Sequence, residues 1–343
     1  MNSKFFQSPE RDRPRTRVFP AFLPFHGCPV RCIFCAQTLQ TGKESRRVCD
    51  ILTDLDADLQ HALNKNTPPF ELAFYGGTFT ALPPEDQAAC LDLAAKYKKF
   101  GLVTRVRAST RPDALTSERL RVLRDAGLDM LELGIQSFDD APLAASSRGY
   151  GRKTALAGCA LVNDSGLDLG IQLMPGMPGM TPPMFREDIA DAVAQHPVAV
   201  RLYPCLVLAE TALAALYADG RFTPWPLEET VPLLAEAQLA FWRANITVIR
   251  IGLAPEDGLD QGGILAGPQH PALGSIVRGL ALFRYIEEEI ARFGLPVAEL
   301  TLPRRFQGEF WGHKGERKAA YAAIGIRPES VKWHDKDWCA FRK

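Results

Sequence analysis

Short apolar segments alternate with helical segments along most of the chain, and this alternation limits the possible folds more than any other feature. Repetition of strand and helix is typical of a parallel sheet covered by helices. Strands are expected at residues 19–25, 71–75, 102–108, 130–134, 169–173 and 198–204, and helices at residues 54–64, 84–100, 117–126, 152–164, 185–195 and 227–245. Six such units predict an α/β fold built on a partial (β/α)6 barrel similar to a TIM barrel, with its chemistry on the loops that follow the strands.

The rest of the sequence divides into shorter segments. Residues 1–17 are polar and basic, which predicts a flexible arm, whereas residues 18–253 contain the barrel. Residues 248–252 have the composition of one more strand. Residues 254–295 are expected to form a Gly/Pro-rich loop and a connecting helix, and residues 296–343 a small basic α+β module.

Composition excludes several classes of protein. The 343 residues include 40 Lys and Arg and 40 Asp and Glu residues, so no net charge attracts the whole molecule to nucleic acid or to a membrane. No apolar segment reaches the roughly 20 residues that span a membrane, and the first residues lack the apolar core of a secretory signal. We therefore expect a cytoplasmic protein without membrane contact. Its eight Cys residues are too few for a disulfide scaffold, so a compact group of Cys indicates metal binding or catalysis.

Such a group follows the first expected strand, where HGCPVRCIFCAQ contains Cys28, Cys32 and Cys35 with CxxxCxxC spacing. Three thiolates from one loop can bind three iron atoms of a 4Fe-4S cluster and leave the fourth iron open to an external ligand. Zinc with His26 as its fourth ligand is the alternative, because zinc also binds thiolate and imidazole. The second, distant pair of ligands typical of zinc loops was not found in the sequence.

Together with further motifs, the Cys loop resembles the radical S-adenosylmethionine (SAM) enzymes over residues 18–253. The resemblance implies a radical SAM barrel with two cofactors, a 4Fe-4S cluster and SAM. In this family, SAM binds the open iron and one electron cleaves it to a 5'-deoxyadenosyl radical, while the protein orients the reactants. It also implies an electron donor such as flavodoxin or ferredoxin.

The same resemblance implies a set of SAM contacts. Phe34 would pack near the adenine, and the FYGGTFT turn would expose its backbone to the SAM amino group. Ser109 stands where relatives often carry a Glu that contacts SAM. The implied SAM-binding residues are Phe34, Gly76, Gly77, Thr78, Ser109, Gln136, Arg148 and Gln172. The residues alone leave two alternatives open: Arg148 as an ordinary surface charge, and Gln172 as a polar residue tolerated in a core strand.

The phrases FYGGTFTAL, ELGIQSFDD and LMPGMPG resemble those of short bacterial relatives of the radical SAM domain of the Elongator catalytic subunit. This resemblance favours an enzyme that modifies a base of RNA, and tRNA is the expected RNA. Too few residues follow Leu300 for the acetyltransferase domain of the full subunit, so acetyl-CoA chemistry is not expected. Oxygen-independent coproporphyrinogen oxidases share the Gly-Gly-Thr and Gln motifs, which makes a radical enzyme for a small molecule such as a tetrapyrrole the first alternative.

The C-terminal residues give a separate indication of RNA binding. Gly312, His313, Lys314 and Gly315 lie between two expected helices and resemble the GxxG turn of KH modules, which holds the RNA backbone. Residues 303–343 carry ten Lys or Arg against five Asp or Glu residues. A strand at 297–302 and a hairpin of 330–334 with 338–341 complete the expected module. A helical hairpin with a Gly turn would look the same, and a non-catalytic zinc-containing RNA-binding protein is the second alternative for the whole chain.

The catalytic residues are less well indicated. Tyr203 and Cys205 lie near the end of an expected strand, and His270 lies in the Gly-rich loop, where it could move a proton. Arg201 is expected inside the barrel, where it would need an anionic partner. The Arg residues of the arm at positions 11, 13, 15 and 17 could add phosphate contacts.

Overall fold

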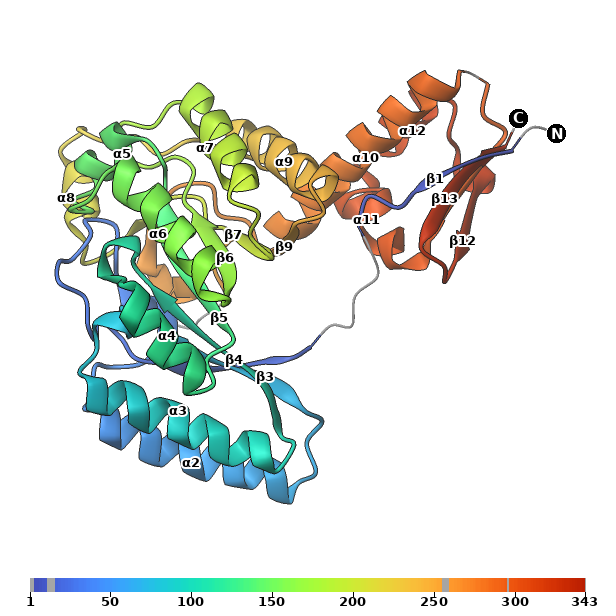
Figure 1. Cartoon of the computed structure of the whole chain (residues 1–343). Helices are drawn as coiled ribbons and strands as arrows, with labels where there is room; N and C mark the ends of the chain where they lie inside the picture. The colour runs from blue at the N-terminus through green and yellow to red at the C-terminus, as the bar shows by residue number, and fades with distance from the viewer. Residues whose placement is uncertain (1–2, 11–15, 255–258, 295, 343) are drawn as a thin grey trace.

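The computed structural model describes residues 3–10, 16–254, 259–294 and 296–342. Figure 1 shows a large α/β part and a smaller C-terminal part, connected by the long helix α10. The strands are β1 (Ser3–Gln7), β2 (Val18–Phe22), β3 (Phe70–Tyr75), β4 (Val103–Thr110), β5 (Met130–Gln136), β6 (Asp168–Leu173), β7 (Ala199–Leu202), β8 (Val207–Leu208), β9 (Thr247–Ile251), β10 (Ile264–Ala266), β11 (Glu299–Pro303), β12 (Val331–His334) and β13 (Trp338–Arg342). The α-helices are α1 (Gln37–Thr41), α2 (Val48–Asn64), α3 (Pro84–Lys99), α4 (Ser117–Asp125), α5 (Asp140–Ala145), α6 (Arg152–Ser165), α7 (Pro182–Ala194), α8 (Ala212–Ala218), α9 (Leu227–Arg243), α10 (Leu273–Phe293), α11 (Gln307–Phe310) and α12 (Lys318–Ala323).

The large part is an open barrel of parallel strands in the order β2-β3-β4-β5-β6-β7-β9. The predicted partial barrel is confirmed, with β9 as a seventh strand. β2 and β9 each have one neighbour in this sheet, so the barrel is not closed. β7 ends at Leu202, earlier than expected, because Pro204 has no N–H group to continue the strand ladder.

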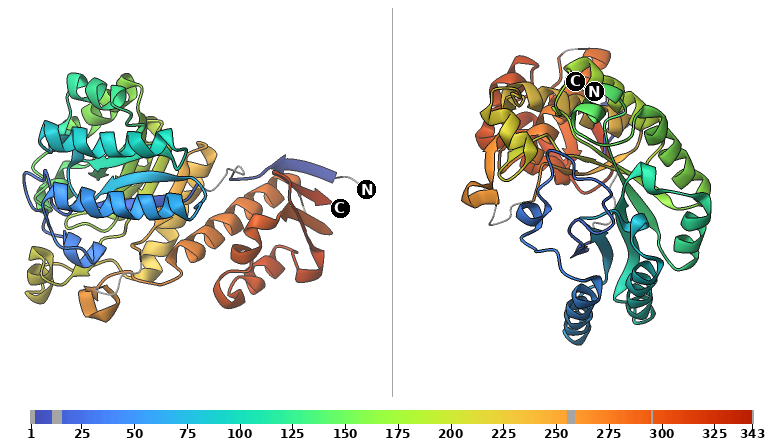
Figure 2. Two further views of the ribbon diagram at one scale, coloured as in Figure 1. Left: turned by 90° about the horizontal axis from the view of Figure 1, so that it is seen from below. Right: turned by 90° about the vertical axis from the view of Figure 1, so that its left-hand side faces the viewer.

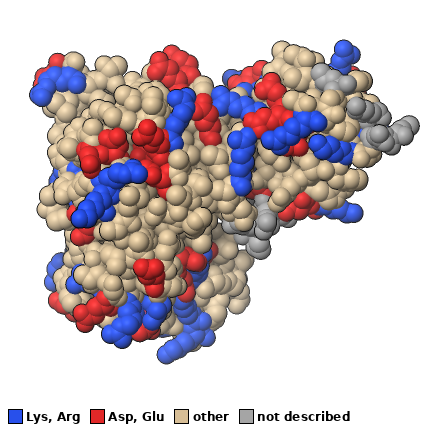
Figure 3. Space-filling model, turned by 45° about the horizontal axis from the view of Figure 1, so that its top comes forward, with Lys and Arg blue, Asp and Glu red and all other residues tan. Residues whose placement is uncertain are grey.

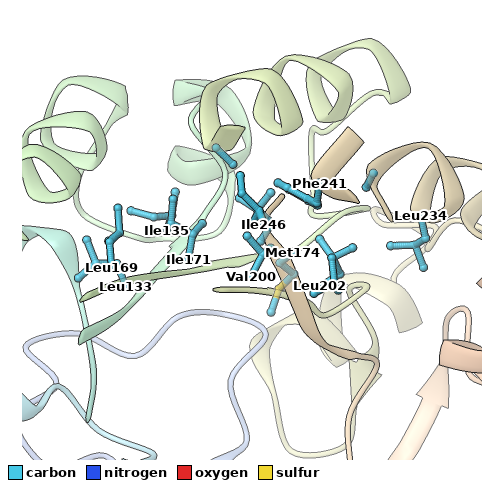
Figure 4. Packing of buried hydrophobic residues seen from close by; sticks show 14 of the residues in the cluster. Leu133, Ile135, Leu169, Ile171, Met174, Val200, Leu202, Leu234, Phe241 and Ile246 are labelled. Atoms are coloured by element: carbon cyan, nitrogen blue, oxygen red, sulfur yellow. The ribbon is translucent and has the colours of Figure 1, made fainter. Parts of the chain in front are cut away.

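The two faces of this sheet differ in polarity. Side chains that point outward are apolar and pack under the helices, as Figure 4 shows for Leu133, Ile171 and Leu202. Side chains at the alternate positions point into the barrel. Most of these interior positions are polar: Glu71, Tyr75, Arg107, Ser109, Glu132, Gln136, Gln172 and Arg201. Parallel strands are usually apolar on both faces, so a polar interior indicates a binding cavity.

Helices cover the outer face of the curved sheet, as the right-hand view of Figure 2 shows. The Gly/Pro-rich loop also contributes to the fold. Within residues 254–274, β10 pairs antiparallel with β8, where the sequence predicted only turns. A strand of three residues is too short to produce a detectable pattern.

The C-terminal part is a mixed four-stranded sheet in the order β1-β13-β11-β12, with helices on one face. The predicted α+β module is therefore present, but the predicted hairpin of β12 and β13 is wrong. β11 lies between these two strands, pairing parallel with β12 and antiparallel with β13. The helices α11 and α12 connect β11 to β12, which allows the parallel pairing.

The prediction of a flexible arm over residues 1–17 is wrong for Ser3–Gln7. These residues form β1, which pairs antiparallel with β13 along its whole length. Phe6 explains the pairing, because its ring stacks on the buried Phe341 at a centroid distance of 4.6 Å. The arm residues Arg11, Arg13 and Arg15 lie outside the described residues.

Side chains hold the N-terminal segment against the C-terminal part. Arg278 of α10 donates to Glu10 at 2.7 Å and to Glu309 at 2.8 Å. Arg305 also donates to the hydroxyl of Ser8 at 2.7 Å. No helix in the described part of the chain combines the length and the apolar character needed to cross a membrane.

Candidate active site

The three Cys residues lie on the loop between β2 and α1, at the carboxyl end of the barrel strands. Cys32 is buried, and Cys28 and Cys35 are partly buried. The Sγ atom of Cys28 lies 3.3 Å from the hydroxyl oxygen of Thr78. Burial, followed by the nearby Cys32 and Cys28 thiols, raises the pKa of Cys35 to about 12. The three sulfur atoms therefore lie near each other on this loop.

The loop supplies the ligand type of an iron–sulfur cluster. Its three thiolates would each bind a different iron atom, as in such a cluster. The ring of His26, the proposed fourth zinc ligand, instead forms a hydrogen bond with the carbonyl oxygen of Arg46 at 2.6 Å.

The Gly-Gly-Thr turn after β3 supports the Cys loop. A Cβ atom on Gly77 would lie 2.1 Å from the carbonyl oxygen of His26, so no other residue fits without moving that backbone. The backbone N–H of Thr78 donates to the same carbonyl oxygen at 2.8 Å. Gly76 has φ +101°, a conformation that favours glycine. The glycines therefore allow two loop backbones to pack directly against each other.

Two buried guanidinium groups lie beside Cys32. Arg148 donates to the Cys32 Sγ atom at 3.0 Å and to the Gly134 carbonyl oxygen at 2.5 Å. The hydroxyl of Tyr150 accepts from Arg148 at 2.7 Å. Although burial opposes its charge, Tyr150 and Cys32 keep the pKa of Arg148 above its usual value. Arg111, which sequence reasoning missed, lies 3.9 Å from the same sulfur.

This placement decides between the alternatives for Arg148. Its side chain is buried at the candidate cluster ligand, so it is not an ordinary surface charge. Arg111 could have been found by the rule that polar residues just past strand ends take part in chemistry, because it directly follows β4. Asp113 holds Arg111 in place with two contacts of 2.9 and 2.8 Å.

The two Gln residues among the implied SAM contacts, Gln136 and Gln172, contact each other. The Nε2 atom of Gln172 donates to the Oε1 atom of Gln136 at 3.1 Å. Gln136 ends β5 with φ +68°, a conformation that non-glycine residues rarely adopt. Such local strain is common at functional sites. Gln172 faces the barrel interior, which favours its predicted site role over that of a tolerated core residue.

The remaining predicted SAM residues lie near this edge of the sheet. Ser109 and Gly77 line one small cavity together with Tyr75 and His26. The Oγ atom of Ser109 is 3.5 Å from the carbonyl oxygen of Phe74. Phe34 is buried in the hydrophobic core next to the Cys loop. The assignment of these residues to SAM remains a prediction.

A charged network fills the barrel interior below these residues. Arg201 donates to Glu132 at 2.5 Å and to the hydroxyl of Tyr75 at 2.6 Å. Arg107 lies 3.2 Å from both Glu71 and Glu132. Burial disfavours the charge of Glu132, but Arg201 and Arg107 outweigh it and lower the pKa of Glu132. Arg201 is therefore neutralised by the protein and needs no anion from a substrate.

Sequence reasoning missed most of this network, although a signal was present. In FELAFY, VTRVRAST and MLELGIQ, polar residues occur at every second position of a predicted parallel strand. A strand covered by helices on one face and facing a wet cavity on the other produces this pattern.

The three catalytic candidates lie in different surroundings. Tyr203 faces the network, and its hydroxyl accepts from Arg201 at 2.8 Å. Cys205 is 2% exposed in the hydrophobic core, and burial raises the pKa of its thiol to about 12, which suits packing better than chemistry. His270 accepts from the backbone N–H of Ala272 at 3.0 Å and lies 5.4 Å from the ring of His313. It is therefore next to the GxxG turn rather than the Cys loop.

The GxxG turn lies between α11 and α12, as predicted. Gly312 and Gly315 have φ values of +74° and +79°, which favour glycine. A Cβ atom on Gly312 would lie 2.7 Å from the Glu316 side chain. His313 and Lys314 are exposed between the glycines, where a bound phosphate could reach them.

Much of the positive charge of the C-terminal part is paired locally. Figure 3 shows Lys and Arg side chains interspersed with Asp and Glu on this part and on the barrel. The paired cations are Arg304 with Asp335, Arg305 with Asp337, Arg317 with Glu316, and Lys332 and Arg342 with Glu299. The excess of Lys and Arg in the sequence therefore overstates the field that an RNA would meet.

Comparison with known families agrees with the geometry of the Cys loop. The family model of the radical SAM superfamily matches residues 22–192, and the model of the radical SAM C-terminal domain matches residues 197–280. The chain belongs to the radical SAM superfamily. The family resemblance predicted from the motifs is confirmed, and with it the assignment as an enzyme. This family implies a 4Fe-4S cluster and SAM as cofactors.

Similar proteins include the tRNA uridine(34) acetyltransferases of two archaea. The chain is 29% identical to that of Methanocaldococcus infernus over 64% of this chain and 47% of the relative. It is 28% identical to that of Methanocaldococcus jannaschii over 62% of this chain and 46% of the relative. This radical SAM protein thus spans about half the length of the curated relatives that it matches.

A solved structure supports the fold. The archaeal Elp3 of Methanocaldococcus infernus, lacking its residues 1–46, superposes with a TM-score of 0.57 and 22% identity, covering 79% of this chain and 63% of that one. The similarity shows that the two proteins share the radical SAM barrel.

Proposed function

We propose that this radical SAM enzyme modifies a base of tRNA. Its similarity to two enzymes named as tRNA uridine(34) acetyltransferases carries the proposal. The exposed GxxG turn supports it, because such turns admit a sugar-phosphate backbone and Lys314 would neutralise a phosphate. The acetyl transfer in the names of those relatives is not included, because the match covers about half of them.

The residues of the Cys loop have distinct roles in this proposal. Cys28, Cys32 and Cys35 would hold the 4Fe-4S cluster, and the cofactors supply the one-electron cleavage of SAM. Arg148 donates a hydrogen bond to the sulfur atom of Cys32, and the Thr78 hydroxyl, 3.3 Å from the sulfur atom of Cys28, would donate to it once the thiol is deprotonated. These donors stabilise the thiolates that a cluster requires.

Other residues would position SAM and substrate. Gln136 and Gln172 present amide groups at the carboxyl end of β5 and β6, where ribose hydroxyls would find both donors and acceptors. Tyr203 would contact the substrate from the barrel interior, with Arg201 holding its hydroxyl. A flavodoxin or ferredoxin would donate the electron.

The class of enzyme and its substrate are tested separately. Anaerobically reconstituted protein should form 5'-deoxyadenosine from SAM with dithionite, and the Cys32→Ser variant should not. Nucleosides of bulk tRNA are then compared between cells with and without the gene. We expect one modified nucleoside to be absent without it and restored by the wild-type gene but not by Cys32→Ser.

The two assays separate the alternatives. Formation of 5'-deoxyadenosine together with unchanged tRNA nucleosides would reject the tRNA substrate and favour a small molecule such as a tetrapyrrole. Well-folded protein that contains zinc without iron or sulfide would reject the enzyme and favour a zinc-containing RNA-binding protein.

A further inference from the structure

The C-terminal sheet has one covered face and one open face. Phe341 of β13 and Phe6 of β1 pack into the hydrophobic core beneath the helices. Because side chains alternate along a strand, Trp338 of β13 and Phe5 of β1 point to the other side. Figure 1 shows α10, α11 and α12 on one side of this sheet, and no element of the described ranges lies over the other side.

Three aromatic rings adjoin on the open face. The ring of Phe5 lies 5.0 Å from that of Trp338, at an interplanar angle of 71°. The ring of His334 stacks on Trp338 at 4.1 Å. Phe5 is 65% exposed, although exposure of a large apolar ring to water is unfavourable. The three rings thus form one aromatic row, in which Phe5 at the end is the most exposed.

Two exposed cations on this face share a single acidic partner, Glu299, so one positive charge is in excess among these three side chains. Lys332 and Arg342 project from the same side of β12 and β13, with side chains that are 59% and 42% exposed. The acid between them, Glu299, is only 16% exposed. Flat rings beside accessible cations complement the bases and phosphates of a nucleic acid, and an acidic peptide would use the cations but not the rings.

We propose that the open face of this sheet binds a single-stranded segment of RNA. Bases would stack on the row of Phe5, Trp338 and His334, and phosphates would contact Lys332 and Arg342. The proposal rests on the proposed RNA substrate and adds a second contact surface to it. This surface is separate from the GxxG turn, which lies on the helix side of the sheet.

The test separates ring stacking from general apolar contact. Binding of a fluorescent single-stranded oligoribonucleotide of about 12 nucleotides, within the usual site size, is measured by anisotropy on the full chain. Phe5→Leu keeps an apolar side chain but removes the ring, and we expect it to weaken binding about 5- to 150-fold. Phe5→Tyr keeps the ring and should bind within about twofold of the wild type.

Two further variants serve as controls. Phe100 is similarly exposed at 58% but lies at the end of α3 on the barrel, so Phe100→Leu should not change binding. Lys332→Gln should weaken binding and reduce the slope of log affinity against log salt by about one. A change in slope shows contact with phosphate, which loss of packing would not produce.

Several results would overturn the proposal. The wild type could fail to bind the oligonucleotide. The Phe5→Leu and Phe100→Leu variants could bind RNA with equal affinity, or Phe5→Leu and Phe5→Tyr could lose RNA affinity to the same extent. A change in oligomeric state of Phe5→Leu with unchanged RNA affinity would also overturn it, because a second copy of the chain would then cover the face. If the proposed tRNA substrate is wrong, a separate measurement reveals it, because the tRNA nucleosides are then unchanged in cells without the gene.

Discussion

Replacement of Arg148 with Met is expected to make the cluster of this enzyme harder to reduce. The guanidinium donates to the Cys32 sulfur at 3.0 Å and carries a positive charge into a buried site. Reduction adds negative charge to the cluster, so a nearby cation and a hydrogen bond to a ligand sulfur favour the reduced state. Without them the midpoint potential falls.

The size of the fall follows from the strength of the bond. A hydrogen bond to a charged group contributes roughly 1.5–3 kcal/mol. For one electron, about 1.4 kcal/mol corresponds to about 59 mV, so the whole bond is equivalent to roughly 65–130 mV. If about half of the bond is already present in the oxidised state, the fall is about 30–65 mV, and it cannot exceed about 130 mV.

The potential is measured by redox titration of the reconstituted protein, monitored by electron paramagnetic resonance in the absence of SAM. Arg105→Met is the matched control, because Arg105 lies on the same strand as Ser109 but pairs with Asp168 away from the Cys loop. Arg148→Lys keeps a charge but loses the planar fork, and its potential should fall between those of the wild type and Arg148→Met. A folded Arg148→Met protein with a potential within about 20 mV of the wild type would refute the reasoning.

Three other substitutions test the structure. Gly77→Ala should sharply reduce iron bound per chain, because its Cβ atom would meet the His26 carbonyl oxygen at 2.1 Å, whereas Gly308→Ala, with no atom within 4 Å, should bind iron normally. Glu132→Gln should lower the free energy of unfolding by about 3–5 kcal/mol in guanidinium titrations, and a loss below about 1 kcal/mol would contradict a buried network. Burial raises the pKa of Asp188 to about 7 despite hydrogen bonds from Phe138 and Ser137. Between about pH 4 and pH 7 this carboxyl group is ionised in the unfolded chain but protonated in the folded protein, so the free energy of unfolding decreases as the pH rises through this range. Asp188→Asn should therefore melt at a higher temperature than the wild type at pH 8 but not at pH 4, and an equal difference at both pH values would speak against the shift.

The sequence predicted the barrel well because its signals are local. Period and apolar composition located β3 to β6 within a few residues. The spacing of the Cys residues predicted which loop would bind a metal cluster, and that assignment remains a prediction. The family resemblance indicated that the Gly-Gly-Thr turn belongs to the site. The steric need for glycine there is seen only in the structure, where the backbone of Gly77 packs against that of His26.

The missed features depend on contacts between distant residues. β12 and β13 are neighbours in sequence, but β11 pairs with both of them, and no turn signal indicates that choice of partner. Arg201 was expected to need an anionic partner, but Glu132 was not named as that partner, because it is 69 residues away in the chain and its side chain was not recognised as interior. His270 likewise meets His313 only in the folded protein.

The pairing of β1 with β13 joins the two extremes of the described chain. During synthesis, Phe6 leaves the ribosome hundreds of residues before Phe341, so the apolar side of β1 has no partner while the barrel forms. The C-terminal sheet can be completed only after translation of β13 has finished. Premature termination before Trp338 would leave the apolar side of β1 exposed to water, because the strand that pairs with it would be missing.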